Sequence, residues 1–374
     1  MSPEVLRSWV EVNIDALRHN ALTLRSLCAE GTAFMGVVKA DAYGHGIELV
    51  VPVLAPLVDW FGVANLAEAL EVRALAEKTP VMILGTALPS EWKGIREGGF
   101  VPVISTWEEA RGLASSHGEA PFGVHLAVDT GMGRIGVWEA EALALATKIR
   151  ALPGLELSGV GSHFPAADED DAFTVAQTVR FAALVGKLRA EGLVRGPAHI
   201  ANSAGLILHP EAGRDLSRAG LALYGVSPVP GFGERLQPVL SWKTRVSLVR
   251  EVGAGRGISY GRTFVTPRAM RVATLSTGYA DGYQRHLSNR GGCVLIEGRR
   301  CPVLGRVTMD QILVDVSECP GVVAGAEAVL LGGQGEARIS ATDLANWAGT
   351  IPWEIFTGIG RRVARLAVRD ASLL

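Results

Sequence analysis

The chain has 374 residues, of which 48% are hydrophobic and 20% charged, and its formal net charge is −2. This composition is typical of a soluble globular protein, and the absence of a basic stripe argues against nucleic-acid binding. The four cysteines are scattered without a CxxC pair, which favours neither a disulfide framework nor a zinc site, so no metal is expected. No segment approaches the ~20 apolar residues of a membrane-spanning helix, and the first residues lack a signal-peptide core. We therefore expect a cytoplasmic protein with no membrane partner.

Between about residues 32 and 225, short β-branched runs alternate with longer segments of helical period. The clearest helical segment is 169–190, in which Phe173, Ala176, Leu184 and Leu188 fall at helical spacings. Other helices are expected at 67–76 and 107–114. Strict alternation predicts a parallel sheet with crossover helices, and eight units predict a (β/α)8 barrel, with an open doubly wound sheet as the alternative. The eight candidate strands are 34–38, 60–64, 81–84, 101–104, 123–128, 155–161, 198–201 and 216–218.

After about residue 235 the alternation ends, and strand-like segments follow one another with Gly, Pro and Asn turns between them. One helix is expected late, at 341–348. The Pro- and Gly-rich stretch 228–233 is the expected linker. The sequence therefore predicts an α/β chain with a TIM-like barrel over 1–235 and a mainly β domain over 236–374. The strand-like segments are 240–252, 270–275, 292–296, 311–314 and 328–331.

Lys39 ends the first candidate strand, in the run VVKADAYGHG (37–46). In a (β/α)8 barrel this strand end belongs to the catalytic rim. The apolar and small residues around Lys39 would desolvate its amine and lower its pKa from ~10.4, and a neutral amine can form an imine. Tyr43, in the turn that follows, could reach a phosphate. Taken alone, a strand-end lysine is more often an ion-pair partner.

Later strands are followed by further polar segments. DTGMGRIG (129–136) presents Arg134, and SHF (162–164) presents His163, which could stack on an aromatic ring. ANSAG (201–205) and RAGLALYG (218–225) place Ser203 and Gly220 after the last two strands, where barrels bind phosphate. Each segment also has a structural interpretation, such as a turn with a solvated arginine or a buried histidine. In the β domain, segments such as SYGRTF (259–264) and GRVTMDQ (305–311), each taken alone, are more often explained by hairpin packing.

Together and in this order, the seven segments resemble the alanine racemase family, and GYADGY (278–283) and GTIPWEIF (349–356) resemble it too. The resemblance implies a barrel that holds pyridoxal 5′-phosphate, followed by a β domain. It also implies a homodimer in which each active site is shared between chains. The implied activity is the interconversion of L-alanine and D-alanine by a cytoplasmic isomerase, in D-alanine biosynthesis for peptidoglycan.

The resemblance also assigns roles to single residues. Lys39 matches the Schiff-base lysine, and Tyr260 matches a second catalytic base supplied by the partner chain. Two bases make chemical sense, because one rigid base reaches only one face of the substrate Cα; a cation such as Arg134 would help by lowering the Tyr260 pKa. Arg218 would donate to the pyridine nitrogen and leave it uncharged. The remaining matches are Tyr43, Ser203, Gly220 and Leu221 for phosphate, His163 against the ring, His199 supporting Arg218, Arg134 and Met309 for the substrate carboxylate, and Tyr279 and Asp310 lining the approach to the site.

The sequence departs from the family pattern at four positions. Ala127 stands where many members have a carbamylated lysine that pairs with Arg134, so we expect an anion, with chloride as a candidate, near that arginine. Trp353 replaces a common tyrosine near the phosphate, and its larger ring should favour alanine over bulkier substrates. Thr308 and Ala219 replace a common cysteine and proline, and both changes look neutral.

Three alternative functions compete with alanine racemisation. A serine or broad-spectrum racemase is the nearest alternative. A basic-amino-acid decarboxylase on the same architecture would use a glycine-triplet phosphate loop, which is not found in the sequence. A non-catalytic pyridoxal-phosphate carrier would be a single barrel, which leaves residues 236–374 unexplained.

Overall fold

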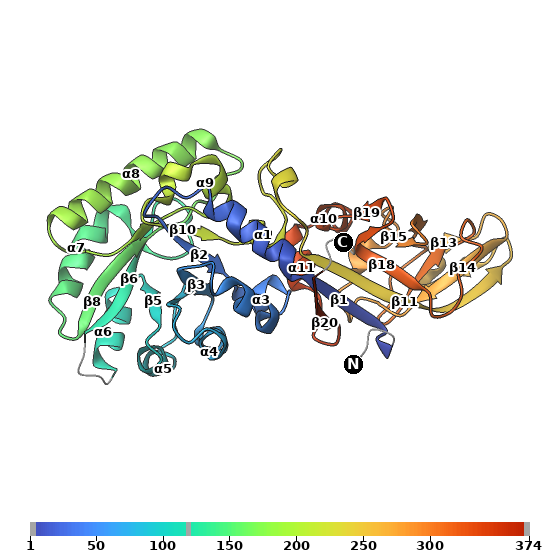
Figure 1. Cartoon of the computed structure of the whole chain (residues 1–374), viewed down its shortest axis with the longest axis horizontal. Coiled ribbons are helices and arrows are strands. Elements are labelled where there is room, and N and C mark those ends of the chain that lie inside the picture. The colour runs from blue at the N-terminus through green and yellow to red at the C-terminus, as the bar shows by residue number, and fades with distance from the viewer. Residues whose placement is uncertain (1–4, 117–120, 370–374) are drawn as a thin grey trace. The chain divides into compact units, whose positions relative to one another are not determined.

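The computed structural model describes residues 5–116 and 121–369. It divides into two compact units, each coloured by sequence position in Figure 1. The barrel unit comprises the described residues within 18–42 and 50–237, and the β unit comprises those within 1–17, 43–49 and 238–374.

The barrel unit is built on eight parallel strands in the order β10-β2-β3-β4-β5-β6-β8-β9, within the described residues. The two ends of this order meet, because the Asp215 N–H donates to Ala198 O (3.3 Å) and the Arg218 N–H donates to Ala201 O (3.2 Å). The barrel is thus nearly closed, which confirms the predicted (β/α)8 architecture over the open sheet. Its strands are β2 (Ala33–Val37), β3 (Trp60–Val63), β4 (Val81–Ile83), β5 (Val101–Ile104), β6 (Phe122–Asp129), β8 (Leu155–Gly161), β9 (Ala198–His199) and β10 (Leu216–Ala219).

Helices connect these strands, and Figure 1 shows α6, α7 and α8 flanking β6 and β8. Local signals start several of them: Thr106 and Glu109 form a capping box at α6, and the Asp170 side chain caps α8. The helices that lie or end in this unit are α1 (Ile14–Arg25), α3 (Ile47–Leu54), α4 (Leu66–Leu75), α5 (Trp92–Glu97), α6 (Trp107–Ser115), α7 (Glu139–Arg150), α8 (Asp171–Ala190) and α9 (Ser203–Leu208).

The inner face of α8 differs in part from its apolar pattern. Leu184 and Leu188 are buried as their spacing suggests, but Ala176 is exposed and the polar Gln177 is buried instead. The Gln177 amide donates to Thr130 Oγ1 (2.6 Å) and to the His163 carbonyl (2.9 Å). A polar residue lies on this face because it ties together two loops at the barrel rim.

The β unit is organised around the long strand β11 (Leu240–Val252), in the order β16-β15-β18-β11-β1-β20, with β14 also pairing with β11. The predicted mainly β character of the C-terminal region is therefore confirmed. The other elements are β14 (Met270–Leu275), β15 (Cys293–Ile296), β16 (Arg299–Pro302), β17 (Ile312–Asp315), β18 (Glu327–Gln334), β19 (Ala337–Ile339), β20 (Ala364–Val368), α10 (Ala341–Ala348), α11 (Pro352–Thr357) and the short pair β12 (Gly257–Ile258) and β13 (Phe264–Val265).

The division of the chain differs from a simple boundary at residue 235. Strand β1 (Ser8–Asn13) pairs antiparallel with β11 and parallel with β20, and all six of its side chains are buried. Residues 43–49 group with the β unit as well. The physical reason is that the β1 backbone pairs on both sides with strands more than 200 residues away in sequence, a pairing that local patterns cannot indicate.

Among the described residues, no helix is long and apolar enough to cross a membrane.

Candidate active site

The predicted site residues of the barrel unit lie at one end of its strands. Lys39 follows β2, and Arg134 lies in the loop after β6. His163 follows β8, His199 is the last residue of β9, and Arg218 lies near the end of β10. Because the strands are parallel, these carboxyl ends share one rim, which is where barrel enzymes place their chemistry.

Arg218 is buried and hydrogen-bonded in several directions. One terminal nitrogen donates to Nδ1 of His199. The other donates to the carbonyls of Ser162 (2.8 Å) and Ile200 (3.1 Å) and lies 3.1 Å from His163 Nδ1. Burial and the nearby Arg134 lower the Arg218 pKa to about 10, so the guanidinium keeps its charge at neutral pH. It is held by neutral acceptors, without a carboxylate among these contacts.

The Arg218 bond fixes the tautomers of two histidines. A guanidinium has no acceptor, so His199 Nδ1 must accept and its proton lies on Nε2. Nε2 then donates to His125 Nδ1, 3.0 Å away. Neutral His125 carries its own proton on Nε2, a buried atom without a hydrogen-bond partner in the described part of the chain. Burial, followed by Arg218, lowers the pKa of His125 to about 3 and holds that of His199 well below 6.5, so both rings are neutral.

Two glycines of β8 make room for these rings. A Cβ atom at Gly159 would lie 2.3 Å from His125 Cε1, and one at Gly161 would lie 2.2 Å from His199 Cε1. Side chains two apart on a strand share a face, so the alternation in Gly159-Val160-Gly161 is required by the imidazoles. His125 was not among the predicted site residues, although it stands in a predicted buried strand, and the alternating glycines of the next strand indicate bulky neighbours.

The pKa of Lys39 is lowered, as its surroundings in the sequence predict. Burial lowers its pKa, nearby Arg134 and Arg218 lower it further, and Glu68 opposes them. The same cations, after burial, lower the pKa of His163 to about 3. Arg134 and Arg218 therefore lie close enough to Lys39 to destabilise the charge on its amine. A group of converging cations fits an anionic ligand that carries an aldehyde for Lys39 and a phosphate, as pyridoxal phosphate does.

Three of the four predicted phosphate contacts, Ser203, Gly220 and Leu221, lie around the turn after β10. The Ser203 hydroxyl accepts hydrogen bonds from the Gly220 N–H (2.9 Å) and the Ala222 N–H (3.4 Å). Leu221 is buried and begins the short helix η3 (Leu221–Tyr224). At the end of that helix the Tyr224 hydroxyl donates to Val37 O (3.0 Å), two residues before Lys39. Tyr224 was not among the predicted residues, although it lies within the RAGLALYG segment.

Arg134 sits in a loop that is anchored at both ends. Asp129 Oδ1 accepts from the N–H groups of Gly131 (2.8 Å) and Met132 (2.9 Å), and the Gly136 N–H donates to Ser105 Oγ (3.0 Å). Ala127, the position of the expected lysine, is buried in β6. The Arg134 side chain is exposed in this chain, so its surroundings here do not impose the burial cost that suggested a bound anion.

The second proposed base lies in the β unit. Tyr260 is 70% exposed, which is unusual for so large a ring. Its neighbours Ser259 (φ 59°) and Arg262 (φ 48°) have left-handed backbone conformations, and Ser259 Oγ donates to Arg306 O (2.5 Å). The loop is thus fixed while its tyrosine projects from the chain.

The other β-unit residues gather on two adjoining loops. The Tyr279 N–H donates to Thr308 O and the Ala280 N–H to Met309 O, both at 3.0 Å. Arg362 bridges the loops through Asp281 Oδ1 (2.7 Å) and Asp310 Oδ1 (2.6 Å). No local sequence signal pointed to Arg362.

Two further predicted residues lie outside these loops. Trp353 is half-buried on α11, and Tyr43 is buried, which raises its pKa to about 12.

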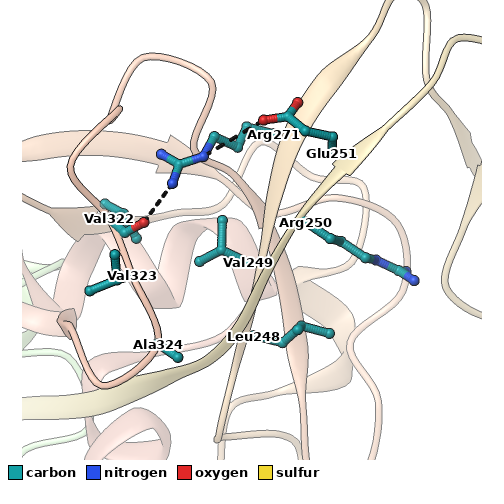
Figure 2. A pocket seen from close by; sticks show the side chains of 8 residues that line it. All are labelled: Leu248, Val249, Arg250, Glu251, Arg271, Val322, Val323 and Ala324. Carbon is teal, nitrogen blue, oxygen red and sulfur yellow. Dashed lines mark hydrogen bonds and ion pairs between the residues drawn. The ribbon is translucent and has the colours of Figure 1, made fainter.

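A separate open hollow lies in the β unit beside β11 and β14. In Figure 2 the Arg271 guanidinium reaches the Val322 carbonyl (2.7 Å) across it. None of its lining residues is a predicted site residue, so it does not belong to the candidate site. They are Leu248, Val249, Arg250, Glu251, Arg271, Val322, Val323 and Ala324.

Comparisons with known proteins agree with the fold. Residues 12–228 match the family model "Alanine racemase, N-terminal domain", and residues 239–367 match "Alanine racemase, C-terminal domain". The chain is 43% identical over 369 residues to the alanine racemase of Symbiobacterium thermophilum, covering 96% of each chain. It is 42% identical over 371 residues to that of Carboxydothermus hydrogenoformans, covering 96% of this chain and 99% of the other.

Solved structures give the same result. The alanine racemase of Streptomyces coelicolor superposes with a TM-score of 0.92 at 35% identity, covering 99% of this chain and 100% of that one. The alanine racemase of Bacillus anthracis with bound L-Ala-P superposes with a TM-score of 0.90 at 33% identity, covering 99% and 97%. The chain belongs to the alanine racemase family. The predicted family is therefore confirmed, and the match to a C-terminal domain excludes a single-barrel cofactor carrier.

Proposed function

We propose that this chain is an isomerase that interconverts L-alanine and D-alanine with pyridoxal phosphate bound to Lys39. Full-length similarity to curated alanine racemases supports the activity. The observation that carries the cofactor proposal is the cationic group at the barrel rim, where Lys39 has a lowered pKa beside Arg134 and Arg218. When bound, pyridoxal phosphate would supply the electron sink that accepts the charge left on Cα after proton loss.

The other cofactor contacts follow from the same geometry. Arg218 would donate to the ring nitrogen, since it stays protonated and is held in place by His199 and two carbonyls. His163 would lie against the ring. Ser203, Gly220, Leu221 and Tyr43 would hold the phosphate, and Trp353 would lie near it in place of the usual tyrosine.

Proton transfer needs one base on each face of Cα. Lys39 would hold and return the proton on the D face, and Tyr260 would do so on the L face. Arg134 and Met309 would orient the substrate carboxylate, and Tyr279 and Asp310 would line its approach. The family resemblance also suggests a location and a metabolic role. The enzyme would work in the cytoplasm, and its D-alanine would be used to build peptidoglycan.

We further propose that the active enzyme is a homodimer in which Tyr260 of one chain serves Lys39 of the other. The support is that Tyr260 and Met309 are 70% and 53% exposed although both are large, and that the Tyr260 loop is rigidly braced. An exposed aromatic ring on a fixed loop fits a contact with another chain.

A substrate panel tests the activity. In polarimetry, L-alanine and D-alanine should each be converted to the same equal mixture of the two enantiomers. The optical rotation of L-serine should change little. Lys39→Ala should abolish the visible absorbance of the bound cofactor together with racemisation. Faster turnover of serine than alanine would favour the broad-spectrum alternative, and retention of both signals in Lys39→Ala would contradict the proposal.

A further inference from the structure

The backbone after Lys39 turns in the direction that L-residues avoid. Ala40 (φ 54°, ψ 53°), Asp41 (φ 54°, ψ 50°) and Ala42 (φ 52°, ψ 50°) all have left-handed helical angles, and Tyr43 has φ 54°. None of the four is glycine, so each carries a Cβ atom that disfavours this conformation. Such a run persists only where surrounding contacts determine it.

A single carboxylate provides such contacts at the start of the turn. Glu68 Oε1 accepts the Ala40 N–H, and Glu68 Oε2 accepts the Ala64 N–H, both at 2.8 Å. Ala40 directly follows Lys39 after β2, and Ala64 directly follows β3. Glu68 thus joins the carboxyl ends of two neighbouring barrel strands, next to the reactive amine.

The position of Glu68 is fixed by its own helix. Asn65 caps α4, and its side chain accepts the Glu68 N–H (3.1 Å), which makes Glu68 the third helical residue. In an ordinary capping box, the side chain of the glutamate at this position accepts the backbone N–H of the capping residue.

The same barrel contains such an ordinary box for comparison. Glu109 Oε2 accepts the N–H groups of Thr106 (3.0 Å) and Ser105 (2.6 Å), while Glu109 Oε1 has no hydrogen-bond partner in the described part of the chain. Glu68 differs because its second oxygen binds the turn that follows Lys39. Helix capping alone does not account for that bond.

We propose that Glu68 is a positioning residue for Lys39, whose carboxylate holds the left-handed turn and so aims the lysine amine at the cofactor. Glu68 acts on the turn and not on the substrate. The inference rests on the proposed function, in which Lys39 carries pyridoxal phosphate.

Glu68→Gln tests this with little change of shape. An amide has one oxygen, so its NH2 group would face one of the two N–H donors and that hydrogen bond would be lost. Glu71→Gln is the matched control, because Glu71 lies on the same helix and is exposed. The full-length protein, freed of cofactor with hydroxylamine, is titrated with pyridoxal phosphate, and covalent attachment to Lys39 is followed by visible absorbance. Hydrogen–deuterium exchange is measured on the peptide that contains Ala40.

We expect Glu68→Gln to weaken covalent attachment by about 10- to 100-fold, as loss of a charge-assisted hydrogen bond implies, and to speed exchange at Ala40. Glu71→Gln should match the wild type in both measurements. Faster exchange with unchanged attachment would overturn the proposal, because Glu68 would then brace the backbone only, and so would two unchanged measurements. If the wild type itself never attaches the cofactor, the proposed function is wrong, and exchange at Ala40 alone decides whether Glu68 holds the turn.

Discussion

The Arg218 guanidinium donates to Nδ1 of His199, and this bond determines where the proton of the imidazole lies. The neutral His199 ring passes the constraint to His125 through a 3.0 Å contact. Arg218 is therefore fixed inside the barrel by neutral acceptors and remains a hydrogen-bond donor. A ring nitrogen placed against it would stay unprotonated, which is the property that the proposed racemase needs from this residue.

Removing the imidazole should destabilise the fold. In His199→Ala a buried guanidinium loses an acceptor, which we expect to lower the free energy of unfolding by about 1–3 kcal/mol. Urea denaturation measures this against His286→Ala, since His286 is exposed. Equal stability of the two variants would show that the Arg218–His199 bond contributes nothing to the fold.

A methyl group on β8 tests the same network without touching its polar atoms. Gly161→Ala would place a Cβ atom 2.2 Å from His199 Cε1, so the ring and then Arg218 must shift. We expect a loss of kcat/KM of about tenfold or more, because small misplacements of catalytic groups are costly. Gly186→Ala on α8 is the control, because no atom lies within 4 Å of its added Cβ. Wild-type kinetics in Gly161→Ala would contradict the placement of His199.

Much of the barrel was predictable from sequence because its strands are short, buried and separated by helices with clear caps. The strands 101–104 and 155–161 and the helix 341–348 have the predicted bounds. Strand β1 was missed because its partners β11 and β20 lie far away in the chain. Its alternation resembles many short apolar runs, and only tertiary pairing distinguishes it.

Candidate site residues could be named from the sequence where they stand in distinctive motifs. Residues whose contacts depend on how the chain packs could not. Lys39 and Arg218 stand in distinctive segments. Glu68 could have been suspected from Asn65 three residues earlier, a capping pattern, but its bond to Ala40 depends on the barrel bringing two strand ends together. Gln177 interrupts an apolar helix face, which is a weak signal of a buried hydrogen bond.

The buried histidines should make stability depend on pH. His125 has a pKa of about 3 in the folded chain against 6.5 for an unperturbed histidine, so protonation favours the unfolded state. Its contribution is complete above pH 6.5 and is lost as the pH falls from 6.5 toward 3. Between pH 6.5 and 5 we expect a loss of ~2 kcal/mol from this group. Urea unfolding of the wild type and His125→Gln at these two pH values measures it, and identical pH slopes would contradict the assignment.

Ala127 cannot supply the carbamate that pairs with Arg134 in many family members, so we predict that chloride binds beside this arginine although its side chain is exposed in the single chain. If chloride takes the place of the missing lysine near Arg134, the KM for alanine should fall when chloride replaces gluconate at constant ionic strength. Ala127→Glu would supply a fixed negative charge, and its KM should no longer respond to chloride. If the KM of the wild type does not change with chloride, no chloride ion acts beside Arg134.

Mixing two inactive variants tests the shared active site most directly. A dimer of one Lys39→Ala chain and one Tyr260→Phe chain would contain one site with both changes and one site with neither, if Tyr260 acts on the partner's Lys39. Equal amounts, dissociated and reassembled at random, should therefore regain about a quarter of wild-type activity. Each variant treated alone should stay inactive. If the mixture also stays inactive although mixed dimers are present, Tyr260 does not act across the dimer and the central claim fails.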